Sequence, residues 1–279
     1  MIISEEINIL VSSDPSLGAQ NINDKGSEFE IVLEDGGIQV PNEAKNVNIV
    51  VEESTVWWTV PNLEQGINDK MYITGPNAQD QQTDFIITIP QGLYDLPGLN
   101  QAILRELENA GAKINPEPLF LLLPDSNTQR VVIRFSYNTV SIDFTPGDTF
   151  RDILGFNSQL VGPISPAPAS VIGDNTAAFN QVNYFLLHSD LTNKGIRYNN
   201  RYDQVVSQVN INVPPGSQIV STPFNPAKVE ANELRGVNRT NIRFWLTDQN
   251  NRLVNTAAEF FSMRLCIRYN MPFIFQKQN

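Results

Sequence analysis

The chain has 279 residues, of which 41% are hydrophobic and 18% are charged, with a formal net charge of −11. This length suits one large β domain or two small ones in a globular protein. The negative charge disfavours nucleic acid as a direct partner, because phosphate binding relies on clustered lysine and arginine. The 19 basic residues are scattered, apart from a loose group at Lys194, Arg197 and Arg201, which we interpret as a solvated face.

The first residues, MIISEEINILV, have no basic segment and carry two glutamates, so they do not resemble a secretory signal. No apolar run approaches the roughly 18–20 residues that cross a bilayer. We therefore expect a soluble protein made in a reducing compartment. Cys266 is the only cysteine, which excludes an intrachain disulfide and a cysteine metal cluster. Its alternating context, MRLCIRY, predicts a buried thiol that packs as a small hydrophobic group.

Residues 1–27 are polar and contain turn signals, so we predict an N-terminal arm that is ordered only against a neighbour. Alternating or β-branched runs then predict strands at 29–35, 47–60, 70–74 and 84–90, the second with a bend near residues 52–54. A helix is predicted over 94–111, with Leu96, Leu99, Ile103, Leu107 and Ala110 on one face, Pro97 in the first turn and Gly111 as its stop.

Strands follow at 118–125, 130–137 and 140–144, and after them the stretch TFRDILGF predicts about two turns of helix. Thr149 and Asp152 have the spacing of a capping box, and Gly155 suits the left-handed conformation that ends a helix. Such a short helix must be packed to be stable. We expect it to plug one end of a sandwich core with Phe150, Ile153, Leu154 and Phe156.

The segment 161–179 is rich in proline, alanine and glycine, which predicts a linker or a long crossover. Further strands are predicted at 182–191, 203–213, 217–224, 241–248 and 261–270. The absence of βαβ alternation excludes the doubly wound and TIM-barrel classes. We predict an all-β protein with two short helices, made of two antiparallel jelly-roll-like β-sandwich units. The predicted domains are the arm at 1–27, a first unit at 28–162 and a second at 163–279. The competing architecture is a single sandwich with long insertions.

Catalytic chemistry has little support in the sequence. His188 is the only histidine, which excludes a two-histidine metal site, and its alternation with apolar residues predicts a structural or surface imidazole. The common nucleotide-binding, hydrolase and zinc-protease motifs are absent. Glycoside hydrolysis needs only two carboxylates, and candidates near strands are Glu52, Glu53, Asp143 and Asp248. Nothing pairs these carboxylates across a cleft, so we expect no enzyme and no catalytic, cofactor-binding or metal-binding residues.

Three local patterns have simple structural interpretations. The stretches DSN (125–127) and DQN (248–250) resemble fragments of calcium loops, but Asx turns explain both. Trp57 and Trp58 are adjacent, so a strand would place one in the core and leave the other for an interface or a sugar platform. The stretch NRT (238–240) matches the N-glycosylation pattern, which we attribute to chance because no secretory route is predicted.

The order of these elements resembles jelly-roll virion proteins of the adenovirus-like lineage, including those of Polinton-type elements, virophages and tailless membrane-containing phages. The resemblance lies in ITIPQGLYDLPGLNQAILREL (87–107), VSIDFTPGDTFRDILGF (140–156) and ANELRGVNRTNIRFWLTDQNNRLVNTAAEFFSMRLCIRY (231–269). It covers roughly residues 29–270. The glycine that the family has in its D-x-x-G turn is Asn251 here, which also tolerates a positive φ.

The resemblance implies a virion structural protein that self-assembles into an icosahedral capsid, as a compact double jelly-roll major capsid protein or as a penton or minor component. Its implied partners are identical copies, in a trimer or a pentamer, and other capsid proteins, through which it could also contact an internal membrane. The implied location is the virion, after synthesis in the host cytoplasm or nucleus. Two other hypotheses stay open: a carbohydrate- or receptor-binding β-sandwich of a spike or adhesin, and a β-sandwich glycosidase.

Overall fold

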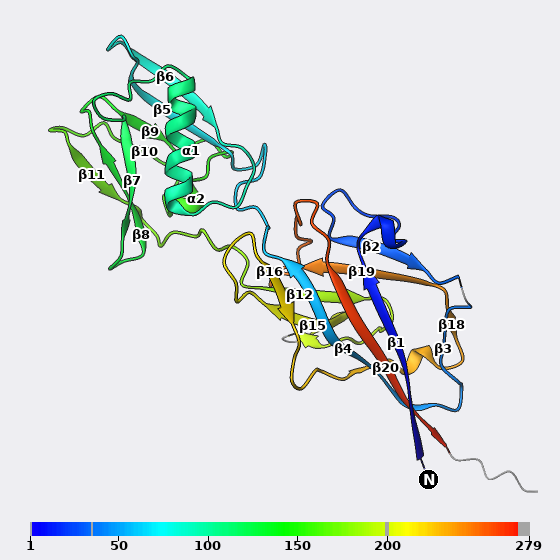
Figure 1. Ribbon diagram of the computed structural model, residues 1–279. Coiled ribbons are helices and arrows are strands. Elements are labelled where there is room, and N and C mark those ends of the chain that lie inside the picture. Colours follow the sequence, from blue (N-terminus) through cyan, green and yellow to red (C-terminus); the bar gives the residue numbers. More distant parts are fainter. Residues whose placement is uncertain (1, 35, 199–200, 273–279) are drawn as a thin grey trace, which may run out of the picture. The chain divides into compact units, whose positions relative to one another are not determined.

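The computed structural model describes residues 2–34, 36–198 and 201–272, which form antiparallel β-sheets and two short α-helices (Figure 1). The all-β class predicted from the sequence is confirmed. The chain divides into two compact units. Unit 1 comprises residues 1–60 and 182–279, and unit 2 comprises Pro61–Gln181. Unit 2 is therefore one continuous insertion within the chain of unit 1.

The expected succession of domains at 28–162 and 163–279 does not match these units. The reason is the pairing of β20 (Ser262–Pro272), which lies between β1 (Ile2–Ser12) and β4 (Lys45–Trp57). The two ends of the sequence thus form one sheet, and the segment between them forms a second unit. The prediction of two β-sandwich units is confirmed and the competing single sandwich is not, but the boundaries between the units differ from those expected.

Unit 1 is a sandwich of two antiparallel sheets. The first has the order β1-β20-β4-β16, with β16 at Gln218–Ser221, and β17 (Val229–Glu230) also pairs with β4. The second has the order β15-β12-β19-β2, with bounds Val205–Asn210, Tyr184–Ser189, Asn241–Thr247 and Glu28–Val32. Phe29 of the second sheet packs at 5.3 Å from Phe261, which directly precedes β20. Both rings are buried, so the two sheets share one core.

Short elements connect the strands of unit 1. They are η1 (Pro15–Leu17), β3 (Ile38–Gln39) paired with β18 (Asn238–Arg239), β13 (Arg197–Tyr198) paired with β14 (Arg201–Tyr202), and η2 (Asn232–Leu234). In β4, the register with β20 shifts where Glu53 pairs with Arg264 and Val51 with Leu265. The extra residue, Glu52, forms a β-bulge, which confirms the predicted bend in this strand.

The predicted N-terminal arm is wrong as a description of residues 1–27. Residues 2–12 pair with β20 along their whole length. Val11, Ser13, Ala19 and Ser27 are buried in unit 1. This segment therefore belongs to the fold of its own chain.

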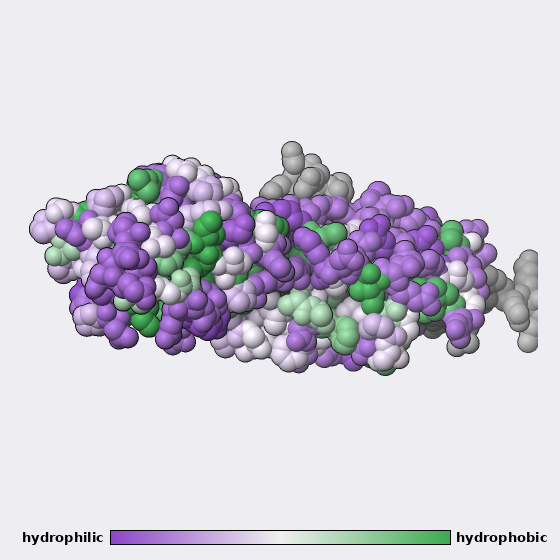
Figure 2. Space-filling view, turned by 90° about the horizontal axis from the view of Figure 1, so that it is seen from above, coloured by the Kyte–Doolittle hydropathy of each residue, from purple (hydrophilic) through white to green (hydrophobic). Residues whose placement is uncertain are grey.

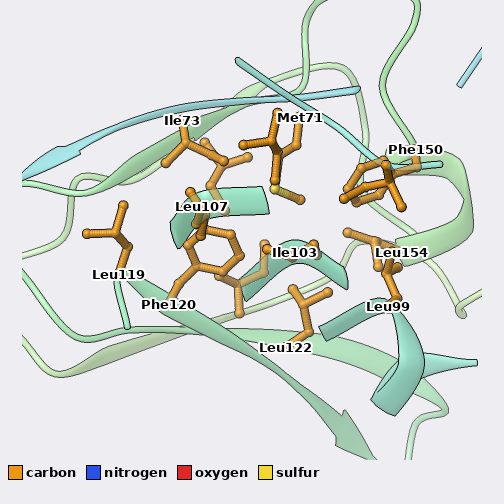
Figure 3. Packing of buried hydrophobic residues seen from close by; sticks show 14 of the residues in the cluster. Met71, Ile73, Leu99, Ile103, Leu107, Leu119, Phe120, Leu122, Phe150 and Leu154 are labelled. Atoms are coloured by element: carbon orange, nitrogen blue, oxygen red, sulfur yellow. The ribbon is translucent and has the colours of Figure 1, made fainter. Parts of the chain in front are cut away.

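Unit 2 is a smaller sandwich that one helix completes. One sheet has the order β10-β9-β5-β6, with bounds Leu160–Val161, Ser141–Asp143, Lys70–Pro76 and Gln82–Thr88. The other has the order β11-β8-β7, with bounds Ala169–Ile172, Arg130–Phe135 and Phe120–Asp125. Helix α1 (Leu96–Asn109) packs against β6 and β7, an edge strand of each sheet. It closes the sandwich where the sheets part, and it buries Leu99, Ile103 and Leu107 as predicted (Figure 3).

Helix α2 (Arg151–Leu154) fills one end of this core, as expected. Phe156 is buried and stacks on Phe144 with the ring centroids 5.2 Å apart. Gly155 ends the helix at φ 78°, which confirms the predicted stop. The predicted capping box is wrong, because the hydroxyl of Thr149 donates to the carbonyl oxygen of Pro146 and the helix starts one residue later.

The segment 161–179 is not a linker. It contains β11, which pairs with β8, and the N–H of Ala178 donates to the carbonyl oxygen of Ile153. Gly173 approaches the backbone of both β8 and α2 so closely that an added Cβ would lie 3.2–3.3 Å from three carbonyl oxygens. This proline-rich stretch therefore packs as part of unit 2.

Candidate functional site

The four carboxylates considered for hydrolysis are engaged in contacts within the fold, and Glu53 lies 3.5 Å from Arg264. Glu52 accepts a hydrogen bond of 2.7 Å from Arg268, and Asp143 accepts bonds from the N–H and hydroxyl of Thr145. Asp248 is buried and receives two guanidinium bonds, of 2.8 and 2.9 Å, from Arg252. Each group already has polar partners, and Asp143 belongs to a different unit from the other three. These contacts favour structural roles.

His188 is fully buried in β12, in the second sheet of unit 1. Its ring stacks on Trp245 with the centroids 5.0 Å apart, and its Nε2 lies 2.8 Å from the hydroxyl of Thr247. Burial lowers the pKa of the imidazole to about 4, while the charge of Asp203 opposes that shift. The ring is therefore neutral at pH 7 and packed within the sheet, in line with the predicted structural imidazole.

Cys266 lies beneath a network of charged side chains on the outer face of the first sheet. Its thiol donates to Glu6 at 3.5 Å, and Arg268 joins Glu6 and Glu52. Arg264 extends the network on the same face. Burial raises the pKa of the Cys266 thiol. A protonated and inaccessible thiol is a poor nucleophile, so this cysteine packs as predicted.

The remaining sequence signals also have structural explanations. Asp125 accepts from the N–H of Asn127 and Asp248 from that of Asn250, so both are Asx turns. Trp58 is buried against Phe185, while the preceding Trp57 is half-buried.

In the basic group, Lys194 and Arg197 are exposed, and the side chain of Arg201 lies outside the described part of the structure. Among the described residues, no group of three His, Cys, Asp or Glu side chains is arranged to hold a metal ion. No helix there is long and apolar enough to cross a membrane.

The most unusual surface of unit 1 is the edge of β1. The strand is 11 residues long and forms the edge of the first sheet, and only Ile2 and Ile3 extend beyond the part of β20 that pairs with β4 (Figure 1). Leu10 is 75% exposed and Ile3 is 44% exposed. On the face drawn in Figure 2, hydrophobic residues form small separate patches within a polar surface. An uncovered strand edge offers main-chain groups for a contact that requires no large apolar patch.

The pairing with β20 determines which groups of β1 face the open edge. The N–H of Ser13 donates to the carbonyl oxygen of Phe261, so residue 13 faces β20. Main-chain direction alternates along an antiparallel strand, and the odd-numbered residues of β1 therefore face β20. The N–H and C=O groups of Ser4, Glu6, Asn8 and Leu10 face outward, and no partner for them is found among the described residues.

The corresponding edge of the second sheet is covered by the protein itself. Gln20 exchanges two main-chain hydrogen bonds of 2.8 Å with Glu30 of β2. The N–H of Asn23 donates to the carbonyl oxygen of Glu28, and its side chain accepts from the N–H of Ser27. The segment that follows β1 thus protects β2 and leaves β1 open. Residues 7–11 were expected to lie in an arm, and instead they belong to this edge strand.

Comparisons with known proteins identify a structural likeness only. No protein-family model matches the chain, and no curated protein matches it. Among solved structures, the chain is similar to a mavirus penton protein, with a TM-score of 0.48 and 10% sequence identity. That alignment covers 96% of this chain and 99% of the other. We base the function proposed below on the geometry and sequence of this chain.

Proposed function

We propose that the protein is a structural subunit of a virion shell, which acts by assembling with identical copies and with other capsid proteins. The observation that carries this proposal is the 11-residue edge of β1, whose outward main-chain groups have no partner among the described residues and which has exposed apolar side chains. Soluble monomers usually protect such an edge, because it pairs readily with another chain. A protein that assembles has a use for it.

The sequence resemblance to jelly-roll virion proteins supports the same function. The stretches that carry it serve the fold: α1 and α2 fill the core of unit 2, and β19 and β20 form central strands of unit 1. The charged and polar groups considered for catalysis have bonding partners within the fold. We therefore infer a structural role without turnover.

Within a shell, we propose a penton or minor component and not a double jelly-roll major capsid protein. Two successive jelly rolls would each use a continuous stretch of chain. Here unit 2 is inserted into unit 1, and α1 completes its two small sheets. We propose a cyclic oligomer, a trimer or a pentamer, located in the virion. The net charge of −11 favours leaving direct genome contact to other proteins.

Light scattering after size-exclusion chromatography tests this function on the purified full-length chain. We expect the protein to self-associate, so that the measured mass rises with protein concentration. Electron microscopy should show closed particles of uniform size. A protein that stays monomeric at every concentration would contradict the proposal. A glycan array on the same sample tests the alternative of a carbohydrate-binding β-sandwich, which would require a specific glycan signal from a monomer.

A further inference from the structure

The open edge of β1 leaves the first sheet incomplete. An edge strand presents a row of unpaired N–H and C=O groups that can pair with another chain. Near the start of β1, Ser4, Glu5 and Glu6 are exposed, and so is Ile3 on the opposite face from Ser4. A further strand along β1 would satisfy the outward main-chain groups and cover Ile3. The inference about this strand rests on the proposed function and specifies one contact of the assembly.

We propose that the occupant is β1 of a second copy, which pairs antiparallel to the first about a two-fold axis at Ile7. The contact is isologous, because the same strand is used by both copies, so it would join two cyclic oligomers and a different contact would close each of them. It would join the first sheets of two molecules into one continuous sheet in the order β16-β4-β20-β1-β1-β20-β4-β16.

The outward main-chain groups limit the possible registers. They belong to even-numbered residues, so even residues of one copy must lie opposite even residues of the other. An axis at Ile7 meets this condition and pairs the whole strand Ile2–Ser12 with itself. An axis at Glu5 or Glu6 would place that glutamate directly opposite its own copy, which destabilises a sheet. An axis at Asn8 would leave the first residues of the strand unpaired.

The side chains are self-complementary in the register at Ile7. Odd-numbered residues share the inner face with the buried Leu265 and Ile267 of β20. They form the non-hydrogen-bonded pairs, in which side chains approach most closely. Ile7 would therefore pack on Ile7 of the second copy, and Ile3 would lie opposite Val11.

The charged residues of β1 are also accommodated. Glu5 would lie opposite Ile9 of the second copy, and Glu6 opposite Asn8, so no like charges face each other directly. Arg268 lies 3.5 Å from Glu6 within each copy and offsets its charge near the axis. Asn8 already donates to Glu6 within one chain at 3.5 Å, a contact that the pairing repeats across the axis.

Cysteine cross-linking tests the register. Ile7→Cys places two thiols opposite each other in a non-hydrogen-bonded pair, so mild oxidation of the full-length protein should give a disulfide-linked dimer on a non-reducing gel. Ile9→Cys is the matched control, because its thiol would face Glu5 and should not cross-link. The natural Cys266 is fully buried and should not contribute. Equal cross-linking of both variants, or none in Ile7→Cys, would overturn the proposed register.

A proline pair tests the edge without relying on disulfide formation. Asn8→Pro removes an N–H that faces outward, so it should weaken self-association at least about tenfold while the unfolding temperature of the monomer is kept. Ile9→Pro removes an N–H that faces β20 and should destabilise the monomer itself. If Asn8→Pro associates as strongly as the natural protein, β1 is not the contact, although other oligomers could still support the proposed shell function. If the natural protein shows no self-association at all, this would contradict both the β1 contact and the proposed shell function.

Discussion

Acidification should destabilise unit 1 through His188. The imidazole is fully buried and stacked on Trp245, and burial lowers its pKa from 6.5 to about 4. In the unfolded chain the same group titrates near its ordinary pKa. Between pH 6.5 and pH 4 the unfolded state therefore binds a proton that the folded state does not, and stability falls as the pH falls. The difference between the two pKa values corresponds to about 3 kcal/mol by pH 4.

Tryptophan fluorescence can follow this effect in unit 1 alone. The three tryptophans, Trp57, Trp58 and Trp245, all belong to unit 1. Urea unfolding at pH 7, 6, 5 and 4 should show a loss of stability in the natural protein that is absent from His188→Gln. Gln can keep a hydrogen bond to Thr247 but does not titrate, and the carboxylates titrate alike in both proteins. If the unfolding free energies of the two proteins fall in parallel, His188 is not the cause of the loss of stability at low pH.

Four further results are expected from the packing. Gly155→Ala should destabilise unit 2 by more than about 1 kcal/mol, because its φ is 78° and the added Cβ would lie 2.3 Å from the carbonyl oxygen of Asn175; Phe156→Ala should cost about 3–5 kcal/mol. Hydrogen exchange of α1 measures both, and unchanged protection would contradict them. Cys266 should react with a thiol reagent at pH 8 only after unfolding, and rapid labelling of the native protein would show an open site. Deleting residues 1–27 should lower the unfolding temperature of unit 1, since burial of Val11 alone contributes about 1.5–3 kcal/mol; an unchanged temperature would mean that β1 is dispensable.

Features that depend on neighbouring residues could be predicted from the sequence. The period of Leu99, Ile103 and Leu107 identified the buried face of α1, because helix geometry places these residues together before any tertiary contact forms. Gly155 and Asn251 were expected to tolerate positive φ, and they have φ of 78° and 62°. The Asx turns followed from side chains that bond their own backbone two residues later. Such signals are short in range, so the sequence itself contains them.

Contacts between distant segments could not be predicted in this way. Residues 2–12 were expected to belong to an arm, but their partner, β20, is near the other end of the sequence. Proline content suggested a linker at 161–179, whereas β11 there pairs with β8. The candidate site shows the same limit: the sequence of β1 does not reveal that β20 pairs with one side of the strand and that the other side has no partner among the described residues. Strand pairing joins residues by main-chain groups that every residue has, and for this reason the tertiary structure alone decided which edges are covered.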